Sequence, residues 1–334
     1  MTMQALVLEQ LHQPLLLKEV ATPVLQENEV LIRLKAAALN RRDFWIQQGQ
    51  YAAIRLPAIL GSDGAGIVAD IGATVDAAWK DKEVVINPGL HWGKNPKVQS
   101  REFRVLGMPD SGTFAQYVKV PVTHLVPKPA HLTWQQAAAL PLAGITAYRS
   151  LFTRAELQSY EKILITGIGG GVALQCLQFA VATGAEVYVT SGSDDKLQQA
   201  IQMGAKGGAN YKQADWVASL KSQAGAFDVI IDSAAGDSVA KLTELAAEGG
   251  RIVFYGGTNG VINGVVPGRI FWKQLSILGS TMGTEGEFNT MVEFVEKHKL
   301  VPVVSKIFAF AEVNEALQYM QEAAQFGKIV LEIE

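Results

Sequence analysis

The chain has 334 residues, of which 49% are hydrophobic and 18% are charged, so it has the composition of a compact protein long enough for two domains. Its formal net charge is −3 and its basic residues form only short pairs such as Arg41 and Arg42, which argues against a nucleic-acid partner. The first residues lack a secretion-signal pattern and no run reaches the roughly 18 apolar residues of a membrane span, so we expect a cytoplasmic protein without membrane association.

The N-terminal part of the chain contains short apolar segments separated by Gly, Pro and Asn residues. This pattern predicts an antiparallel or barrel-like β domain over residues 1–125. We expect its strands at residues 4–8, 15–20, 29–36, 66–70, 83–86 and 114–120. Residues 87–108 are polar and rich in turn residues, which predicts a long surface loop.

From Thr133 onward, helices and strands alternate. Thr133 and Gln136 form a capping-box motif before an apolar helix, and Pro141 is expected to divide that helix in two. Strands are expected at residues 162–166, 186–190, 227–232, 251–255 and 275–279, and helices at residues 172–182, 194–203, 215–223 and 238–247. Apolar strands that alternate with helices predict a doubly wound parallel sheet, here over residues 126–280.

The tail, residues 281–334, contains two amphipathic helices at 287–298 and 313–324 and a last strand at 328–333. Because this strand is similar to the N-terminal segments, we expect the tail to complete the first domain, which would then be discontinuous. Cys176 is the only cysteine, which excludes an intrachain disulfide and a cysteine zinc knot. Its position in an apolar helix pattern predicts a buried, unreactive thiol.

The strongest motif is the run K-I-L-I-T-G-I-G-G-G-V-A-L-Q at residues 162–175, where a strand passes through glycines into a helix. Such a turn lets the backbone approach a pyrophosphate at a helix start, which predicts dinucleotide binding at Gly169, Gly170, Gly171 and Val172. The register of the G-x-G-x-x-G pattern is irregular, because Gly167 and Gly169 leave Val172 in the sixth position. The alternative is a tight turn that binds nothing.

The residues after the second strand indicate which dinucleotide is bound. The strand ends without the acidic residue that binds the ribose of NAD, and Ser191, Ser193 and Lys196 offer hydroxyl and ammonium groups to a 2′-phosphate. We therefore predict NADP(H). Asp194 and Asp195 argue against this choice unless they only charge the start of the next helix.

Several motifs, in order along nearly the whole chain, resemble the medium-chain dehydrogenase/reductase family. They are A-A-A-L-N-R-R-D-F at 36–44, L-P-A-I-L-G-S-D-G-A-G-I-V at 56–68, G-T-F-A-Q-Y-V at 112–118, L-P-L-A-G-I-T-A-Y at 140–148, the glycine run, and G-K-I-V-L-E-I at 327–333. The resemblance implies a GroES-like β-barrel catalytic domain interrupted by a Rossmann domain, with the active site in the cleft between them.

The chain differs from zinc-dependent members of that family at the positions of the catalytic metal ligands. These positions look like Asn40, Ser62 and Leu142, which are poor or impossible zinc ligands. The stretch 91–104 lacks the cysteines of the structural zinc lobe, so His91 is expected to be an ordinary loop residue. The sequence therefore predicts no metal.

The zinc-free members that the chain resembles are NADPH:quinone oxidoreductases and relatives that act on enones. By this resemblance Asn40 and Tyr51 orient the substrate, although backbone bracing or core packing is an equal alternative for each. Lys328 either approaches the cofactor or cleft or is an exposed charge. The resemblance also places cofactor contacts at Thr146, Tyr211, Gly256, Gly257 and Met282.

We therefore expect a zinc-independent oxidoreductase that transfers hydride from NADPH to a quinone, enone or reactive carbonyl. The alternatives are a zinc-free NADP-dependent alcohol dehydrogenase and a non-catalytic NADPH-binding sensor or structural protein. The resemblance further implies a homodimer formed near residues 261–280, whose apolar side chains would otherwise face solvent.

Overall fold

The computed structural model describes residues 1–333, which form two compact units. The first contains Met1–Leu142 and the segment that begins at Gly283, and the second is Ala143–Met282. The first boundary lies at 142/143, later than the predicted 125/126. The reason is that strand β10 (Leu125–Pro127) pairs with β6 (Glu83–Ile86), and helix α2 (Trp134–Ala138) packs on strands β3 and β5 of the same unit.

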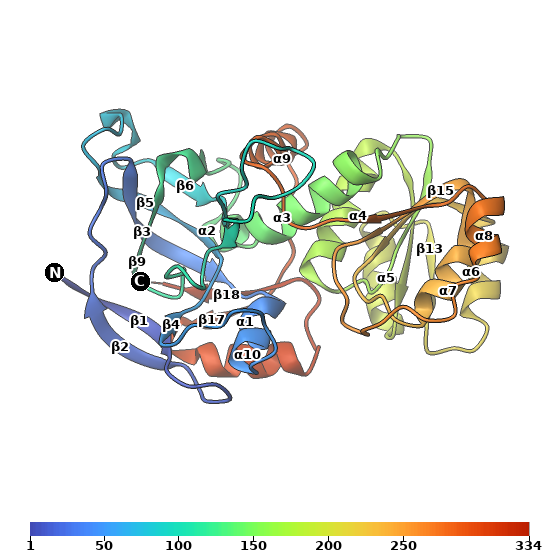
Figure 1. Ribbon diagram of the computed structural model, residues 1–334, viewed down its shortest axis with the longest axis horizontal. Helices are drawn as coiled ribbons and strands as arrows, with labels where there is room; N and C mark the ends of the chain where they lie inside the picture. The colour runs from blue at the N-terminus through green and yellow to red at the C-terminus, as the bar shows by residue number, and fades with distance from the viewer. Residues whose placement is uncertain (334) are drawn as a thin grey trace. The chain divides into compact units, whose positions relative to one another are not determined.

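The first unit is built from mostly antiparallel strands (Figure 1). Its largest sheet has the order β10-β6-β5-β3-β18-β17, and β9 also pairs with β3. A second sheet has the order β2-β1-β4, and β7 pairs with β8 inside the predicted surface loop. The strands not yet located are β1 (Thr2–Leu8), β2 (Leu16–Ala21), β3 (Glu29–Ala38), β4 (Ala58–Ile59), β5 (Asp63–Ile71), β7 (Gly89–Leu90), β8 (Arg104–Val105), β9 (Tyr117–Pro121), β17 (Val304–Ala309) and β18 (Lys328–Glu332).

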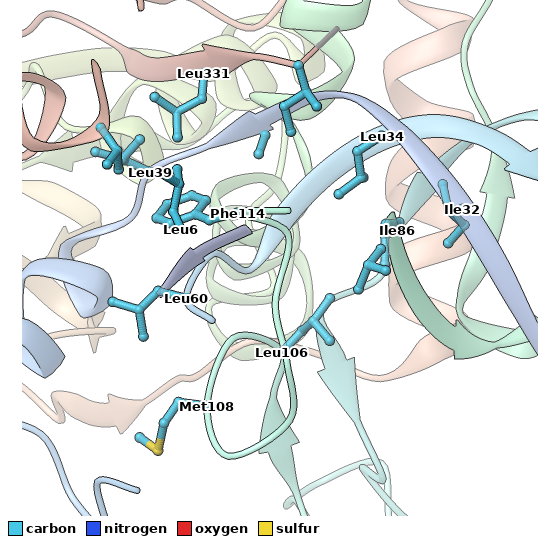
Figure 2. Close-up of a cluster of buried hydrophobic side chains, with 14 of the residues drawn as sticks. Leu6, Ile32, Leu34, Leu39, Leu60, Ile86, Leu106, Met108, Phe114 and Leu331 are labelled. Carbon is cyan, nitrogen blue, oxygen red and sulfur yellow. The ribbon is translucent and has the colours of Figure 1, made fainter. Parts of the chain in front are cut away.

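The tail returns to the first unit, as its strand pattern predicted. Strand β18 pairs antiparallel with the end of β3 and parallel with β17. Helices α9 (Glu285–Lys297) and α10 (Val313–Gln321) follow the amphipathic pattern, and α10 buries Val313, Leu317 and Met320 in the β-domain core. Leu331 belongs to the same core as Leu34 and Phe114 (Figure 2), so distant parts of the chain share one apolar interior.

The second unit is a six-stranded parallel sheet with the order β13-β12-β11-β14-β15-β16. The strands are β11 (Lys162–Ile165), β12 (Glu186–Ser191), β13 (Gly207–Asn210), β14 (Phe227–Asp232), β15 (Ala246–Phe254) and β16 (Ser276–Gly279). From β11 the chain adds β12 and β13 on one side, and after β13 it returns to add β14, β15 and β16 on the other side of β11. Because parallel crossovers are right-handed, the helices on the two sides of this reversal cover opposite faces of the sheet.

The helices of this unit flank the sheet (Figure 1). They are α4 (Gly171–Thr183), α5 (Asp194–Gln202), α6 (Trp216–Ala224), α7 (Ser238–Leu245) and α8 (Pro267–Trp272). Helix α3 (Pro141–Tyr148) begins at the proline predicted to divide the apolar run, and a π-helical turn, Arg149–Arg154, follows it. The capping box at Thr133 is also present. None of the helices in residues 1–333 combines the length and apolarity needed to cross a membrane.

Two helices and six strands were not predicted from the sequence: α1 (Arg41–Gln47), α8, β4, β7, β8, β10, β13 and β17. Helix α1 is short and contains two arginines, and β13 has the glycine-rich sequence G-G-A-N, so neither shows a clear apolar period. Helix α1 matters for function, because it begins directly after Asn40.

Candidate active site

A buried polar cluster surrounds Asn40 at the end of β3. The Asn40 side-chain nitrogen Nδ2 donates to Asp63 Oδ2 at 2.9 Å, and its oxygen Oδ1 accepts from Lys328 Nζ at 2.7 Å. Lys328 Nζ also donates to Asp63 Oδ2 at 2.8 Å and to the Leu39 carbonyl at 2.7 Å. The Lys328 side chain is 5% exposed and that of Asp63 is fully buried, so this ion pair is shielded from water.

The fold explains why these three residues meet. The end of β3 pairs with β18 on one side and with the start of β5 on the other, where Ala38 lies opposite both Val330 and Asp63. Lys328 and Asp63 therefore lie beside Asn40, the second residue after β3. The sequence left open whether Lys328 is an exposed charge, and the structure shows that it is buried.

Helix α1 holds the other side of Asn40. Asp43 accepts a hydrogen bond from the Asn40 backbone N–H at 2.8 Å and one from the Gly61 N–H at 3.2 Å. Burial raises the pKa of Asp43, although Arg42 and these backbone bonds act in the opposite direction. Because Asp43 caps the helix start through the backbone, the Asn40 side chain is left to bind Asp63 and Lys328.

Arg42 extends the polar cluster toward Ser62. Its guanidinium donates to the Ser62 hydroxyl and to the Leu106 carbonyl, each at 2.8 Å, and the Ser62 hydroxyl donates to the same carbonyl at 2.7 Å. Ser62 is fully buried and its hydroxyl is used as both donor and acceptor. The guanidinium also lies 5.2 Å from the centre of the Tyr51 ring.

Tyr51 lies in the loop after α1 and is 38% exposed. Within the part of the chain that the structure describes, its phenol has no hydrogen-bond partner, whereas the Asn40 amide is committed to two. Tyr51 is therefore not a core-packing residue, and its hydroxyl is available to a bound molecule.

The three positions that resemble zinc ligands do not fit a zinc ion. Asn40 Oδ1 already accepts from an ammonium, and the Ser62 hydroxyl already accepts from Arg42 and donates to the Leu106 carbonyl. The Leu142 side chain has no lone pair, and its backbone N–H donates to Asp63 Oδ1 at 2.7 Å. Among the described residues no group of three His, Cys, Asp or Glu side chains is placed to hold a metal.

In the second unit the glycine run forms a turn between β11 and α4. Gly167 and Gly169 have φ values of +65° and +127°, a conformation that favours glycine, so the irregular G-x-G register is the one the backbone follows. Helix α4 begins at Gly171, and Gly170 at its N-cap supplies no capping side chain. The first N–H groups of a 13-residue helix, those of Gly171 and Val172 included, therefore lack a side-chain cap.

This turn fits a dinucleotide pyrophosphate. A Cβ atom built on Gly170 would meet no heavy atom within 4 Å, so the backbone there faces open space. Side chains of the neighbouring strand end hold the turn, since the Gly167 N–H donates to the Thr190 hydroxyl at 3.2 Å. An anion in this space would face helix N–H groups and the positive end of the α4 dipole.

The residues around Gly192 fit the phosphate of NADP(H). A Cβ atom on Gly192 would lie 2.8 Å from the Tyr211 hydroxyl and 2.9 Å from Lys212 Cε, so both side chains cover this glycine. Lys196 approaches Gly169 in the same way, with its Cδ 3.0 Å from the built Cβ. A phenol and two lysine side chains thus lie at the two turns, Tyr211 and Lys212 at Gly192 and Lys196 at Gly169, and such groups can donate to a phosphate.

The serines beside Gly192 differ in their exposure. Ser191 is buried, and its hydroxyl accepts from the Ser193 N–H at 3.2 Å, so it braces the turn. Ser193 is half-buried at the start of α5. Asp194 and Asp195 lie in the first turn of α5, and Asp194 accepts from the Asn210 side chain at 2.8 Å. The acids therefore charge the helix start, as the alternative interpretation proposed.

The other predicted cofactor residues lie in the same unit. The Thr146 hydroxyl contacts Met282 Sδ at 3.9 Å, and Met282 has a φ of +42°. Gly256 approaches the Ser233 carbonyl, 2.7 Å from a built Cβ, whereas Gly257 faces open space.

Burial raises the pKa of the Cys176 thiol far above its ordinary value, which agrees with the predicted inert cysteine.

Sequence reasoning missed several residues of both sites. Asp43 and Asp63 lie within the family motifs, but the sequence assigns no role to them or to Lys212. Lys212 directly follows Tyr211, so its position next to a predicted phosphate contact was the signal that could have found it. No local signal identified Asp63, because its partner Lys328 is 265 residues away in the chain.

Comparison with known proteins agrees with this architecture. Residues 26–130 match the alcohol dehydrogenase GroES-like domain family, and residues 171–297 match the zinc-binding dehydrogenase family. A zinc-type alcohol dehydrogenase-like protein of Leptosphaeria maculans is 37% identical over 97% of this chain and 96% of its own length. A quinone oxidoreductase of Mus musculus is 29% identical, with 94% and 92% of the two chains covered.

Solved structures give the same result. A crystal structure of an NAD-dependent alcohol dehydrogenase superposes with a TM-score of 0.93 at 33% identity, covering 99% of this chain and 100% of the other. Both domain families match in the order that the two units require, and the similarity covers nearly the full length. The chain is an oxidoreductase of the medium-chain dehydrogenase/reductase family.

Proposed function

We propose that this protein is an NADPH-dependent, zinc-independent reductase of quinones, enones or reactive carbonyl compounds. The observation that carries the proposal is the Asn40 cluster, in which the three positions that resemble zinc ligands are an amide bound to an ammonium, a serine hydrogen-bonded to Arg42 and to the Leu106 carbonyl, and a leucine. The cofactor turn beside β11 is intact. A site with a hydride donor and no metal ligands suits acceptors that are reduced without a Lewis acid.

The residues of this chain would act by binding and positioning. The backbone of the glycine turn and the residues at Gly192 would hold NADPH, which would supply the hydride. Asn40 offers the second hydrogen of its Nδ2 group, and Tyr51 offers its phenol, to the oxygen of the acceptor. Hydrogen-bond donors fixed before the reaction stabilise negative charge on that oxygen as it develops.

The choice of NADPH rests on the groups around Gly192. Tyr211 and Lys212 cover this glycine, Lys196 lies against Gly169 in the preceding turn, and Asp194 and Asp195 belong to the first turn of α5. The alcohol dehydrogenase structure with 33% identity is described as NAD-dependent, so the cofactor must be measured directly.

The test is a steady-state assay with a panel of quinones and enones, in which the protein is measured before and after treatment with a zinc chelator. We expect NADPH oxidation with a kcat/KM at least about tenfold above that with NADH, and no change after treatment with a zinc chelator. Preference for NADH, or restoration of activity by zinc, would contradict the proposal. Binding of NADPH without turnover of any acceptor would instead support the non-catalytic alternative.

A second candidate activity is the oxidation of alcohols, which the name of the 33%-identical structure favours. NADP⁺-linked oxidation of primary and secondary alcohols distinguishes it from quinone reduction. A kcat/KM for alcohols above that for every quinone and enone would make this candidate the better one.

We also propose that the protein is a homodimer joined through its second unit. Strand β16 is at the edge of the sheet, and the neighbouring segment carries the exposed apolar side chains of Val261, Phe271, Trp272 and Ile277. Trp272 is 81% exposed and Val261 77%. An unpaired strand edge beside such side chains favours pairing with a second copy.

A further inference from the structure

The ammonium of Lys328 is a buried cation whose hydrogen-bonding capacity is filled. Its three N–H groups have three acceptors at 2.7–2.8 Å: the Leu39 carbonyl, Asn40 Oδ1 and Asp63 Oδ2. Asp63 in turn accepts from the Leu142 N–H. The ion pair therefore ties together the end of β3, the start of β5 and the start of α3, which are the segments that carry the three zinc-ligand positions.

The chemistry of this cluster fixes the orientation of the Asn40 amide. An ammonium can only donate and a carboxylate can only accept, so Oδ1 must face Lys328 and Nδ2 must face Asp63. A flipped amide would place two donors, and also two acceptors, against each other. Nδ2 has two hydrogens and donates one of them to Asp63, so the second has no acceptor among residues 1–333.

We propose that Lys328 is a positioning residue that orients and polarises the Asn40 amide, so that this amide and not a metal ion presents the positive end of a fixed dipole to the substrate oxygen. The hydrogen bond from the ammonium draws electron density onto Oδ1, which makes the remaining N–H a stronger donor. The proposal rests on the proposed reductase function and deepens it, because it assigns the charge that replaces the metal.

The main experiment compares Lys328→Met with a matched control, Lys128→Met. Lys128 is another buried lysine of the same unit, with a carbonyl partner, Leu132, at 2.9 Å and a carboxylate partner, Glu83, at 3.2 Å, but it contacts no predicted site residue. Both variants should lose thermal stability. Only Lys328→Met should lower kcat, by about tenfold or more, while the Kd for NADPH changes by less than about twofold.

A rescue experiment separates the charge of Lys328 from its packing. In Lys328→Ala, n-propylammonium should restore kcat in a saturable manner, because it replaces the missing methylenes and the ammonium. The same concentration of n-propanol should not. The acceptor should be a fully substituted benzoquinone, which has no free ring position for addition of the amine. Equal rescue by propanol would show that only packing matters and would overturn the proposal.

A spectroscopic measurement tests the positioning without turnover. Selective ¹⁵N labelling of asparagine, with Asn40→Ser to assign the signal, reports the Asn40 side-chain NH₂ group. In Lys328→Met we expect this signal to shift and its hydrogens to exchange at least about tenfold faster, with no change in Lys128→Met. An unchanged Asn40 signal would overturn the proposal even if the wild-type enzyme is active. If the wild type has no reductase activity but the Asn40 signal still changes in Lys328→Met as expected, only the proposed function is refuted.

Discussion

Tyr211 and Lys212 bring a phenol and an ammonium to Gly192 from the end of strand β13. Strand β13 pairs with β12, so Asn210 lies opposite Ser191 and the two residues that follow it reach the turn after β12. In the proposed NADPH site, recognition of the 2′-phosphate would therefore be shared between two neighbouring strand ends. A ligand without the 2′-phosphate would not use the charge of Lys212.

The substitution Lys212→Gln should weaken NADPH binding more than NADH binding. Loss of one ammonium near a phosphate should raise the Kd for NADPH by about 5- to 20-fold and leave that for NADH within about twofold. Titration by cofactor fluorescence measures both. Lys206→Gln is the control, because Lys206 is exposed and precedes β13 at the opposite end of the strand. Equal weakening of both cofactors would place Lys212 outside the phosphate site.

A single methyl group at Gly170 should block the cofactor without harming the fold. The φ of Gly170 is −79° and a Cβ there meets nothing, so Gly170→Ala should keep the wild-type Tm. The methyl would occupy the space proposed for the pyrophosphate, and the Kd for NADPH should rise at least about tenfold. Gly286→Ala in α9 is the control, since its Cβ would meet only the Thr284 hydroxyl at 3.9 Å. Unchanged binding by Gly170→Ala would show that the cofactor lies elsewhere.

Among the elements of the second unit, strand β15 is tied to the start of β11 by a bidentate ion pair. Arg251 donates to the two Glu161 oxygens at 2.8 and 2.7 Å, and also to the Ala155 carbonyl after the π-helical turn. Burial acts to raise the pKa of Glu161, but the bonds from Arg251 and from the Gln158 N–H outweigh it and hold that pKa below its ordinary value. The pair therefore links β15, the start of β11 and the end of the π-helical turn, and its strength depends on the ionisation of Glu161.

The substitution Glu161→Gln should cost about 1–3 kcal/mol of stability near pH 7. Because the folded-state pKa is lowered, the carboxylate contributes stability above its ordinary pKa of 4.5, and this contribution is lost as the pH falls through the folded-state pKa. Denaturant unfolding from pH 7 to pH 3 should show the variant and the wild type converging in acid. Glu248→Gln, at an exposed glutamate, should track the wild type throughout. A constant difference across this range would contradict the assignment.

At the scale of the whole molecule, the exposed apolar segment beside β16 is the proposed subunit contact. Each protomer has a mass of 36.0 kDa, so a dimer has twice that mass. The pair of substitutions Trp272→Glu and Ile277→Lys would place charges on this surface and at the strand edge, where burial without partners is unfavourable. Tyr160 is 83% exposed on another part of the same unit and provides the control, Tyr160→Glu.

Light scattering after size-exclusion chromatography measures the outcome directly. The wild type and Tyr160→Glu should elute as dimers, and the double variant as a monomer with its two units still folded by circular dichroism. A wild type that is monomeric at micromolar concentration would contradict the proposed dimer. A double variant that stays dimeric would show that the subunits contact each other through another surface.

The sequence by itself determined the features that depend on neighbours in the chain. The strand–turn–helix at residues 162–175, the absence of an acid at the tip of β12 and the capping box at Thr133 each lie within a few residues, so their backbone consequences follow from local geometry. The sequence also has a leucine at a position that resembles a zinc ligand, and a leucine side chain cannot bind a metal wherever the fold places it.

Only the tertiary structure decided how the polar residues of the first unit are used. The buried state of Lys328, the fixed amide of Asn40 and the saturated hydroxyl of Ser62 all depend on pairing between segments far apart in the chain, up to 289 residues for Lys328 and the Leu39 carbonyl. The local sequence around a charged residue does not show which residue it will pair with. Lys328 becomes buried when β18 pairs with β3, and the residues after β3 together with Asp63 supply the acceptors that offset its desolvation.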